Sequence, residues 1–174
     1  MGTENKGSTF PKSQVLNDLD NIKGQFLELL SLIDREEETL IAGAEFPFDD
    51  LNRMGSLSYE EINCYGHEVI EEMLWQTAEV IRRIDVQSGR VRKILNWLNW
   101  KLNKALAMMP QELLEFKERE TKYCMLSQHY SVVRYLLEEY QDYQRQEVHW
   151  QHLSKNMEKK ERILWHILDR LTNK

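Results

Sequence analysis

An uninterrupted heptad pattern constrains the fold of this chain more than any other feature. Apolar or small residues follow one another at alternating steps of four and three across residues 70–109: Ile70, Leu74, Thr77, Ile81, Ile84, Ser88, Val91, Leu95, Leu98, Leu102, Ala105 and Met109. A repeat that averages 3.5 residues keeps one face of a helix turned toward a packing partner. These residues, called the seam below, therefore predict one long helix with coiled-coil packing.

Local signals set the ends of this helix. Ser58 and Glu61 have the spacing of a capping box, which predicts a start near Tyr59. Gly89 costs about 1 kcal/mol of helix propensity, but the seam keeps its register on both sides, so we expect the helix to continue through a local softening. Pro110 has no amide hydrogen to donate, which predicts the turn and the start of a third helix over residues 111–171.

The rest of the chain also has helical periodicity. An N-terminal helix is predicted from Ser13 to near Leu40, with Val15, Leu19, Ile22, Phe26, Leu29 and Ile33 on one face. The third helix is predicted to carry two apolar faces, separated by the polar segment 141–147. Its first face is Tyr123, Leu126, Tyr130, Val133, Leu137 and Tyr140, and its second is Trp150, Leu153, Met157, Leu164, Ile167 and Leu171.

These elements predict an all-α fold, a long antiparallel helical hairpin with an additional N-terminal helix. Residues 1–12 are expected to be a disordered tail, 13–57 the N-terminal helix and a loop, and 58–174 the hairpin. Seven glycines and three prolines in 174 residues leave few helix breakers. Cys64 and Cys124 have no pairing pattern, and no apolar run is long enough to span a membrane. We expect a cytoplasmic protein, in the host cytoplasm if it is phage-encoded.

Charge is distributed unevenly along the second predicted helix. Residues 82–110 carry seven basic residues and one acid, Asp85, for a net charge of +6, whereas the whole chain is −6 and the remainder is therefore −12. Residues 59–81 carry six glutamates and no Lys or Arg. The basic residues and the two tryptophans among them are the candidate nucleic-acid-binding set: Arg82, Arg83, Arg90, Arg92, Lys93, Trp97, Trp100, Lys101 and Lys104.

Both tryptophans fall on the side of the helix away from the seam. They belong to a second stripe with steps of three and four: Arg83, Val86, Arg90, Lys93, Trp97, Trp100 and Lys104. Cations neutralise phosphates and flat rings stack on bases, which predicts sequence-independent binding of single-stranded DNA. A weaker second contact is predicted near the C-terminus, at Lys155, Lys159, Lys160 and Arg162.

Another interpretation of the stripe stays open. An outward aromatic stripe also suits packing under the N-terminal helix or against another subunit. The protein would then be a structural or adaptor coiled-coil protein, such as a virion or assembly component. The opposite charges of residues 59–81 and 82–110 would pair in a head-to-tail or antiparallel neighbour. We therefore expect a homo-oligomer under either interpretation.

Patterns typical of metal sites are incomplete. Cys64 and His67 are one turn apart, as are His149 and His152, but a structural zinc site needs about four ligands. We expect no metal and no cofactor.

Patterns typical of enzymes are also weak. Carboxylates at helical spacing resemble those of magnesium-dependent all-α nucleotide pyrophosphatases, but they are farther apart in the chain than in that family: Glu68, Glu71, Glu72, Glu139 and Asp142. There is no glycine-rich phosphate loop and no Ser/His/Asp order. We expect a protein that is not an enzyme, with the pyrophosphatase as a third hypothesis.

The layout of residues 75–172 resembles the phage recombination mediators of the UvsY type. The resemblance lies in the basic arm 82–109 with its aromatics and in the closing helix at 148–168, VHWQHLSKNMEKKERILWHIL. It implies a helical hairpin that forms a ring, binds single-stranded DNA and helps to load a recombinase in place of a single-strand-binding protein. The acidic net charge and the first 58 residues depart from that family's pattern.

Overall fold

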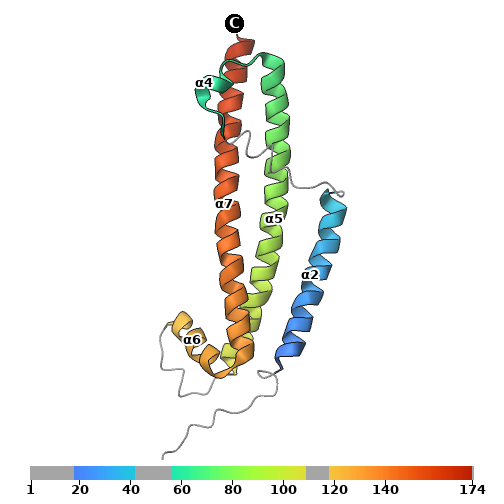
Figure 1. The fold of residues 1–174 in the computed structure, drawn as a ribbon, viewed down its shortest axis with the longest axis vertical. Helices are drawn as coiled ribbons and strands as arrows, with labels where there is room; N and C mark the ends of the chain where they lie inside the picture. Colours follow the sequence, from blue (N-terminus) through green and yellow to red (C-terminus); the bar gives the residue numbers. More distant parts are fainter. Residues whose placement is uncertain (1–17, 42–55, 109–117, 174) are drawn as a thin grey trace, which may run out of the picture. The chain divides into compact units, whose positions relative to one another are not determined.

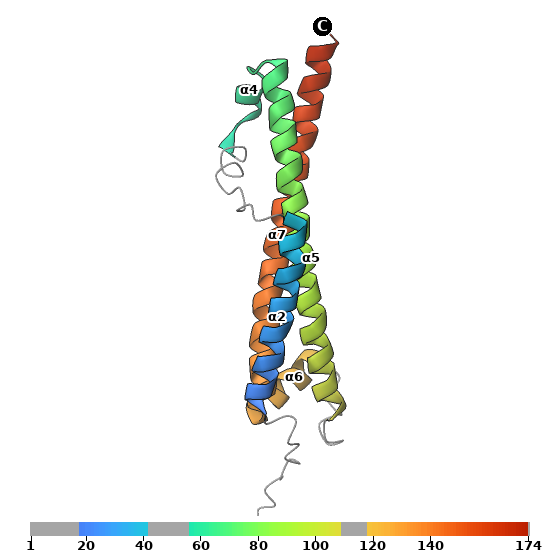
Figure 2. The same cartoon turned by 90° about the vertical axis from the view of Figure 1, so that its right-hand side faces the viewer.

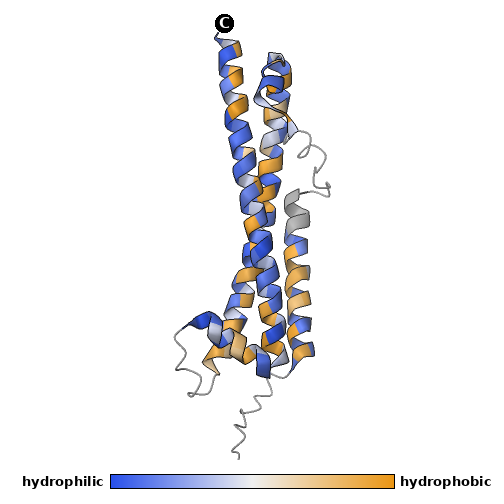
Figure 3. Ribbon diagram, turned by 60° about the vertical axis from the view of Figure 1, so that its left-hand side comes forward, coloured by the Kyte–Doolittle hydropathy of each residue, from blue (hydrophilic) through white to orange (hydrophobic). Residues whose placement is uncertain are grey.

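In a computed structural model of the chain, residues 18–41, 56–108 and 118–173 are described, and all of their regular structure is helical. The helices are α2 (Leu19–Ile41), α4 (Tyr59–Ile62), α5 (His67–Ala107), α6 (Arg119–His129) and α7 (Ser131–Thr172) (Figure 1). Each long helix has a hydrophobic face and a hydrophilic face (Figure 3). The chain divides into two compact units, the first from residues 1–31 and 94–143, the second from 32–93 and 144–174.

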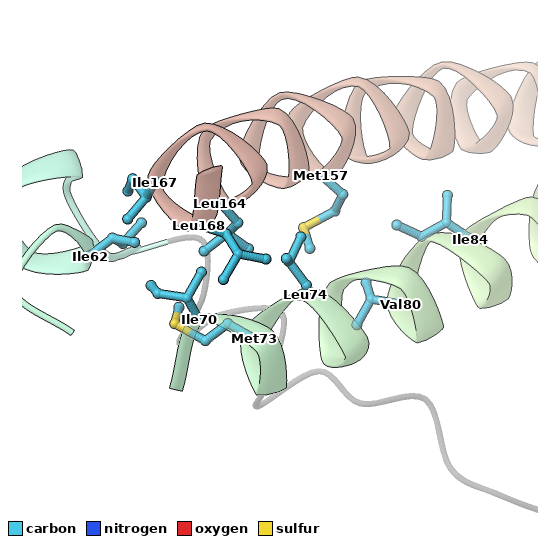
Figure 4. Close-up of a cluster of buried hydrophobic side chains, with 10 residues drawn as sticks. All are labelled: Ile62, Ile70, Met73, Leu74, Val80, Ile84, Met157, Leu164, Ile167 and Leu168. Carbon is cyan, nitrogen blue, oxygen red and sulfur yellow. The ribbon is translucent and has the colours of Figure 1, made fainter. Parts of the chain in front are cut away.

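The core of the second unit lies between α5 and α7. Ile70, Met73 and Leu74 of α5 point toward Leu164 and Leu168 of α7, as Figure 4 shows. Val80 and Ile84, farther along α5, belong to the same cluster as Met157, which comes earlier in α7. The two helices therefore run antiparallel. The short helix α4 adds Ile62, which has no exposed surface, beside Ile167.

The core of the first unit is built around a third helix. Phe26 of α2 is 3% exposed, and its ring centroid lies 5.5 Å from that of Trp97 in α5. The rings of Tyr135 and Tyr143 in α7 lie 6.3 and 6.1 Å from Phe26, edge to face. Within this unit α2 thus lies beside both α5 and α7 (Figure 2). Edge-to-face aromatic pairs add about 0.5–1.5 kcal/mol each to the burial of the rings.

These contacts confirm the predicted all-α fold with a hairpin and an N-terminal helix. Every seam residue from Ile70 to Ala105 is buried except Ile81, which is partly buried against the core. The helix continues through Gly89, as the register on its two sides predicts. On α2, Ile22, Phe26 and Ile33 of the predicted apolar face are buried.

The predicted start of the long helix at Tyr59 is wrong. The capping box is present, with the Ser58 amide donating to Glu61 and the Glu61 amide donating to the Ser58 hydroxyl, but α4 ends at Ile62. A turn follows, and α5 begins at His67, where the Gly66 carbonyl accepts from the Ile70 amide. Glycine is a poor helix former, so the chain can leave the helix here and place Ile62 in the core.

The predicted third helix is also interrupted. Tyr130 adopts an extended conformation (φ −126°, ψ 115°), and its amide still donates to Leu126 while its carbonyl accepts from Arg134. Helix α6 therefore passes into α7 through a single residue. Tyr130 and Val132 are both buried, although they would face nearly opposite sides of a straight helix, about 200° apart. The interruption of the helix at Tyr130 therefore allows the side chains of Tyr130 and Val132 both to be buried.

Several predictions fall outside the described residues. These are the tail 1–12, the helix start near Ser13, all but the last two residues of the loop predicted over 42–57, the seam residue Met109 and the turn at Pro110.

Candidate nucleic-acid interface

The predicted set of nine residues divides between the two units. Arg82, Arg83, Arg90, Arg92 and Lys93 belong to the second unit, and Trp97, Trp100, Lys101 and Lys104 belong to the first. The two groups differ in what surrounds them.

Two of the arginines bind the same glutamate on their own helix. Arg82 donates to both oxygens of Glu79 at 2.9 Å, and Nε of Arg83 donates to Oε1 at 2.7 Å. These two guanidinium groups lower the pKa of Glu79 to about 2, because they stabilise its carboxylate. Both arginines are thus turned toward the acidic half of α5.

The other three cations of the second unit are matched by acids from other helices. Arg90 lies 2.8 Å from Asp34 of α2, and Arg92 lies 3.5 Å from Glu147 of α7. Lys93 donates to Glu36 of α2. All five basic residues of the candidate set that belong to the second unit are therefore engaged by carboxylates of the chain. A phosphate would have to compete with those carboxylates.

Trp97 is covered rather than exposed. Its ring packs on Phe26 of α2, so this part of the stripe follows the interpretation in which it packs under the N-terminal helix. Lys101 donates to the Gln25 side chain, also on α2. Burial, and secondarily the charge of Lys104, lowers the pKa of Lys101.

Trp100 is the aromatic residue of the stripe that reaches solvent. Its side chain is 53% exposed, and the ammonium groups of Lys101 and Lys104 lie 4.9 and 5.3 Å from its ring centroid. Lys101 also lies 5.0 Å from the ring of Trp97. An exposed ring and two like charges are therefore held together on one turn of α5.

A further cation borders this turn and was missed in the sequence. Arg119, at the start of α6, donates at 2.9 Å to Asn99 and to the Tyr123 hydroxyl, and also donates to Asn103. These partners are neutral. In the described residues Lys101, Lys104 and Arg119 make no salt bridge with an acid. We call Trp100, Lys101, Lys104 and Arg119 the Trp100 cluster. Sequence spacing could not place Arg119 here, because Arg119 belongs to another helix and the register between helices sets which side chains meet.

The predicted second basic contact keeps three exposed residues at i, i+4 and i+7 of α7, Lys155, Lys159 and Arg162, whereas Lys160 is set apart from them. Lys160 is partly buried and donates to the Leu57 carbonyl, and burial lowers its pKa. Arg162 is highly exposed and lies 3.9 Å from Glu158. Lys155 and Lys159 are exposed.

The histidine and carboxylate patterns do not assemble in the described ranges. His67 lies 3.5 Å from Glu71 and near Thr172, while His149 packs edge to face on Trp150. Within residues 18–41, 56–108 and 118–173, no three His, Cys, Asp or Glu side chains gather as a metal site. None of the described helices combines the length and apolar character needed to cross a membrane.

A second aromatic surface was also missed in the sequence. Trp75 of α5 is 80% exposed and Trp165 of α7 is 57% exposed, and both line one open groove of the second unit. Trp75 stands off the seam, which was a signal that it faces outward. The position of Trp165 across from it depends on the register between the two helices.

No protein-family model, curated protein or solved structure matches this chain significantly.

Proposed function

We propose that this protein is a non-enzymatic accessory of DNA recombination or replication that binds single-stranded DNA through the Trp100 cluster. One observation supports the proposal above all: the ammonium groups of Lys101 and Lys104 lie over the exposed indole ring of Trp100, Arg119 is bonded to Asn99 and Asn103 of the same stretch of α5, and none of these three cations has an acid partner among the described residues. Single-stranded DNA needs a ring for a base and cations for the adjoining phosphates.

The energies favour an exchange of partners at Trp100. A cation over an exposed aromatic ring is worth about 0.5–1 kcal/mol, whereas stacking of a base on an aromatic side chain is worth about 1–3 kcal/mol. A base can therefore displace Lys101 or Lys104 from the ring, and the released ammonium then pairs with a phosphate. Arg119, which borders this turn, provides a third positive charge for the strand.

The ion pairs of the second unit limit the size of this contact. The logarithm of single-strand affinity falls with the logarithm of salt concentration by about 0.7 per neutralised phosphate. Three cations give a slope of about −2, whereas all seven basic residues of 82–110 would give about −5. The salt slope therefore reports which cations bind the strand.

The test is anisotropy of a labelled oligo-dT across a salt series, using the full chain and two variants. Trp100→Ala is expected to weaken binding about 5- to 100-fold, the loss of one stacked base. Trp165→Ala removes a tryptophan of similar exposure from the other unit, and binding should not change. Absence of binding by the unmodified chain at low salt would exclude this function.

The structural or adaptor function is the second candidate. It is favoured by the exposed tryptophans Trp75 and Trp165, because exposed aromatic surface is typical of protein interfaces. Both candidates include a homo-oligomer in the cytoplasm, and for the first a recombinase or single-strand-binding protein is the proposed partner. Sedimentation of the chain with and without oligo-dT tests the oligomer.

A further inference from the structure

The groove of the second unit is built from matching stretches of two helices. Helix α5 contributes Glu71, Leu74, Trp75 and Ala78, and α7 contributes Glu161, Trp165 and Leu168. The groove encloses about 350 Å³. Each stretch is eight residues long, about 12 Å of helix or two turns. This length matches the anchor residues that an amphipathic helix presents at i, i+3 or i+4, and i+7.

The lining is apolar and accessible at the same time. Five of its seven residues are apolar, and the two tryptophans among them are 80% and 57% exposed. On the other flank of α5, Met73 and Val80 are buried. An indole ring that is 80% exposed forgoes most of the stabilisation that its burial would contribute, so Trp75 is placed for contact rather than for folding.

In the first unit, the same two helices, α5 and α7, already bind a third helix of the chain. There α2 packs on α5 and α7 by inserting Phe26 among Trp97, Tyr135 and Tyr143. A third helix with an aromatic or aliphatic anchor is thus compatible with this sequence's own packing. In the second unit, none of the described residues inserts into the groove lined by Trp75 and Trp165.

Charge decides the kind of helix that fits. Glu71 and Glu161 are the two charged residues among those that line the groove, and the side chain of Glu71 is 54% exposed beside His67. On the α5 side of the groove, residues 59–81 of the chain contain no Lys or Arg, whereas on the α7 side the exposed Arg162 follows Glu161 and lies 3.9 Å from Glu158. The charged residues of the lining itself are nevertheless both glutamates, Glu71 and Glu161. A partner with lysines or arginines beside its apolar anchors would pair with these carboxylates, whereas an acidic partner would be repelled.

We propose that the groove between α5 and α7, lined by Trp75 and Trp165, binds a basic amphipathic helix of a partner protein. The apolar face of that helix lies on the two indoles, and its basic residues face Glu71 and Glu161. The inference is independent of DNA binding by the Trp100 cluster.

The test titrates the full chain with a labelled Leu/Lys amphipathic peptide of about 18 residues, using a Leu/Glu peptide of the same pattern as the comparison. The Leu/Lys peptide is expected to bind and the Leu/Glu peptide to fail. The double variant Trp75→Ala/Trp165→Ala should weaken binding about tenfold or more. Because both side chains are more than half exposed, the variant is expected to fold.

Two further variants distinguish the effect of the carboxylates that line the groove from the effect of other carboxylates on the same helices. Glu71→Gln/Glu161→Gln should weaken binding about two- to tenfold at low salt, and less at high salt. The control Glu72→Gln/Glu158→Gln removes the same charge from the same two helices outside this groove and should have no effect. Trp100→Ala should weaken the binding of oligo-dT and leave the binding of the peptide unchanged, which distinguishes failure of one site from failure of the other.

Three results would overturn the proposal. One is equal binding of the Leu/Lys peptide to the double tryptophan variant. Another is equal binding of the Leu/Glu peptide. The third is concentration-dependent self-association that requires Trp75 and Trp165 and resists competition by the Leu/Lys peptide, which would make a second copy of the chain the occupant.

Discussion

Glu79 is the residue at which the acidic and basic halves of α5 meet. It illustrates that the net charge of a segment does not tell how many of its basic side chains are available to bind a phosphate. Its carboxylate accepts hydrogen bonds from Arg82, three residues later, and from Arg83, four residues later. These spacings were readable from the sequence, because residues three and four apart share a helix face. The net charge of +6 for residues 82–110 includes both arginines but not Glu79, which lies just before this segment and binds both of them.

The lowered pKa of Glu79 predicts a pH dependence of stability. Its pKa in the folded state is about 2, below the usual 4.5, so the ionised carboxylate stabilises the fold fully at pH values above about 4.5. That contribution is lost as pH falls from about 4.5 to 2. The side chain is 41% exposed, so the effect should stay below about 1 kcal/mol. In the Glu79→Gln variant, the free energy of unfolding measured with urea should lose this component of its dependence on acid pH. In the unmodified protein, an NMR titration of Glu79 with a midpoint near pH 4.5 would contradict the prediction.

At the scale of elements, α5 carries the heptad pattern and tolerates one weak position within it. Gly89 lies inside the helix beside the buried Ser88, and a Cβ built on it would meet nothing within 4 Å. The seam predicts helix at this residue in spite of glycine, because packing on both sides outweighs a propensity cost of about 1 kcal/mol.

Gly89→Ala is therefore expected to stabilise the protein by about 0.5–1 kcal/mol, measured by urea or thermal unfolding. Gly66→Ala is the matched control. Gly66 also has open space around its Cβ position but precedes the first residue of α5, at the N-cap, where glycine is preferred to alanine, so Gly66→Ala should bring no gain in stability. Destabilisation by Gly89→Ala would mean that the chain requires a flexible residue within α5.

At the scale of the whole molecule, segments far apart in the sequence neutralise and cover the basic stripe. Asp34 and Glu36 of α2 and Glu147 of α7 bind its cations, and Phe26 of α2 covers Trp97. Of the nine residues, Trp100, Lys101 and Lys104 are those that neither pair with an acid nor pack under α2 through an aromatic ring among the described residues. Tertiary packing thus reduced a candidate surface of nine residues to one turn of helix and a neighbouring arginine.

The docking of α2 predicts the effect of removing its anchor. Phe26→Ala should destabilise the protein by about 3–5 kcal/mol, because the ring is buried among three aromatic residues. Hydrogen exchange should accelerate in residues 19–31. Leu27→Ala changes the neighbouring residue, which is 65% exposed, and should cost less than about 0.5 kcal/mol. Similar losses in both variants would show that α2 is not anchored by Phe26.

The sequence by itself determined the helical class, the buried seam from Ile70 to Ala105 and the buried face of α2, because these depend on periodicity within one helix. It did not determine the breaks at Asn63–Gly66 and Tyr130, which follow from burying Ile62, Tyr130 and Val132 together with distant residues. Nor did it determine that Phe26 covers Trp97, that Arg119 binds Asn99 and Asn103 beside Trp100 in the chain, or that Trp165 lies across from Trp75. Those pairings depend on the register between helices, and only the packed structure sets which of many similar side chains meet.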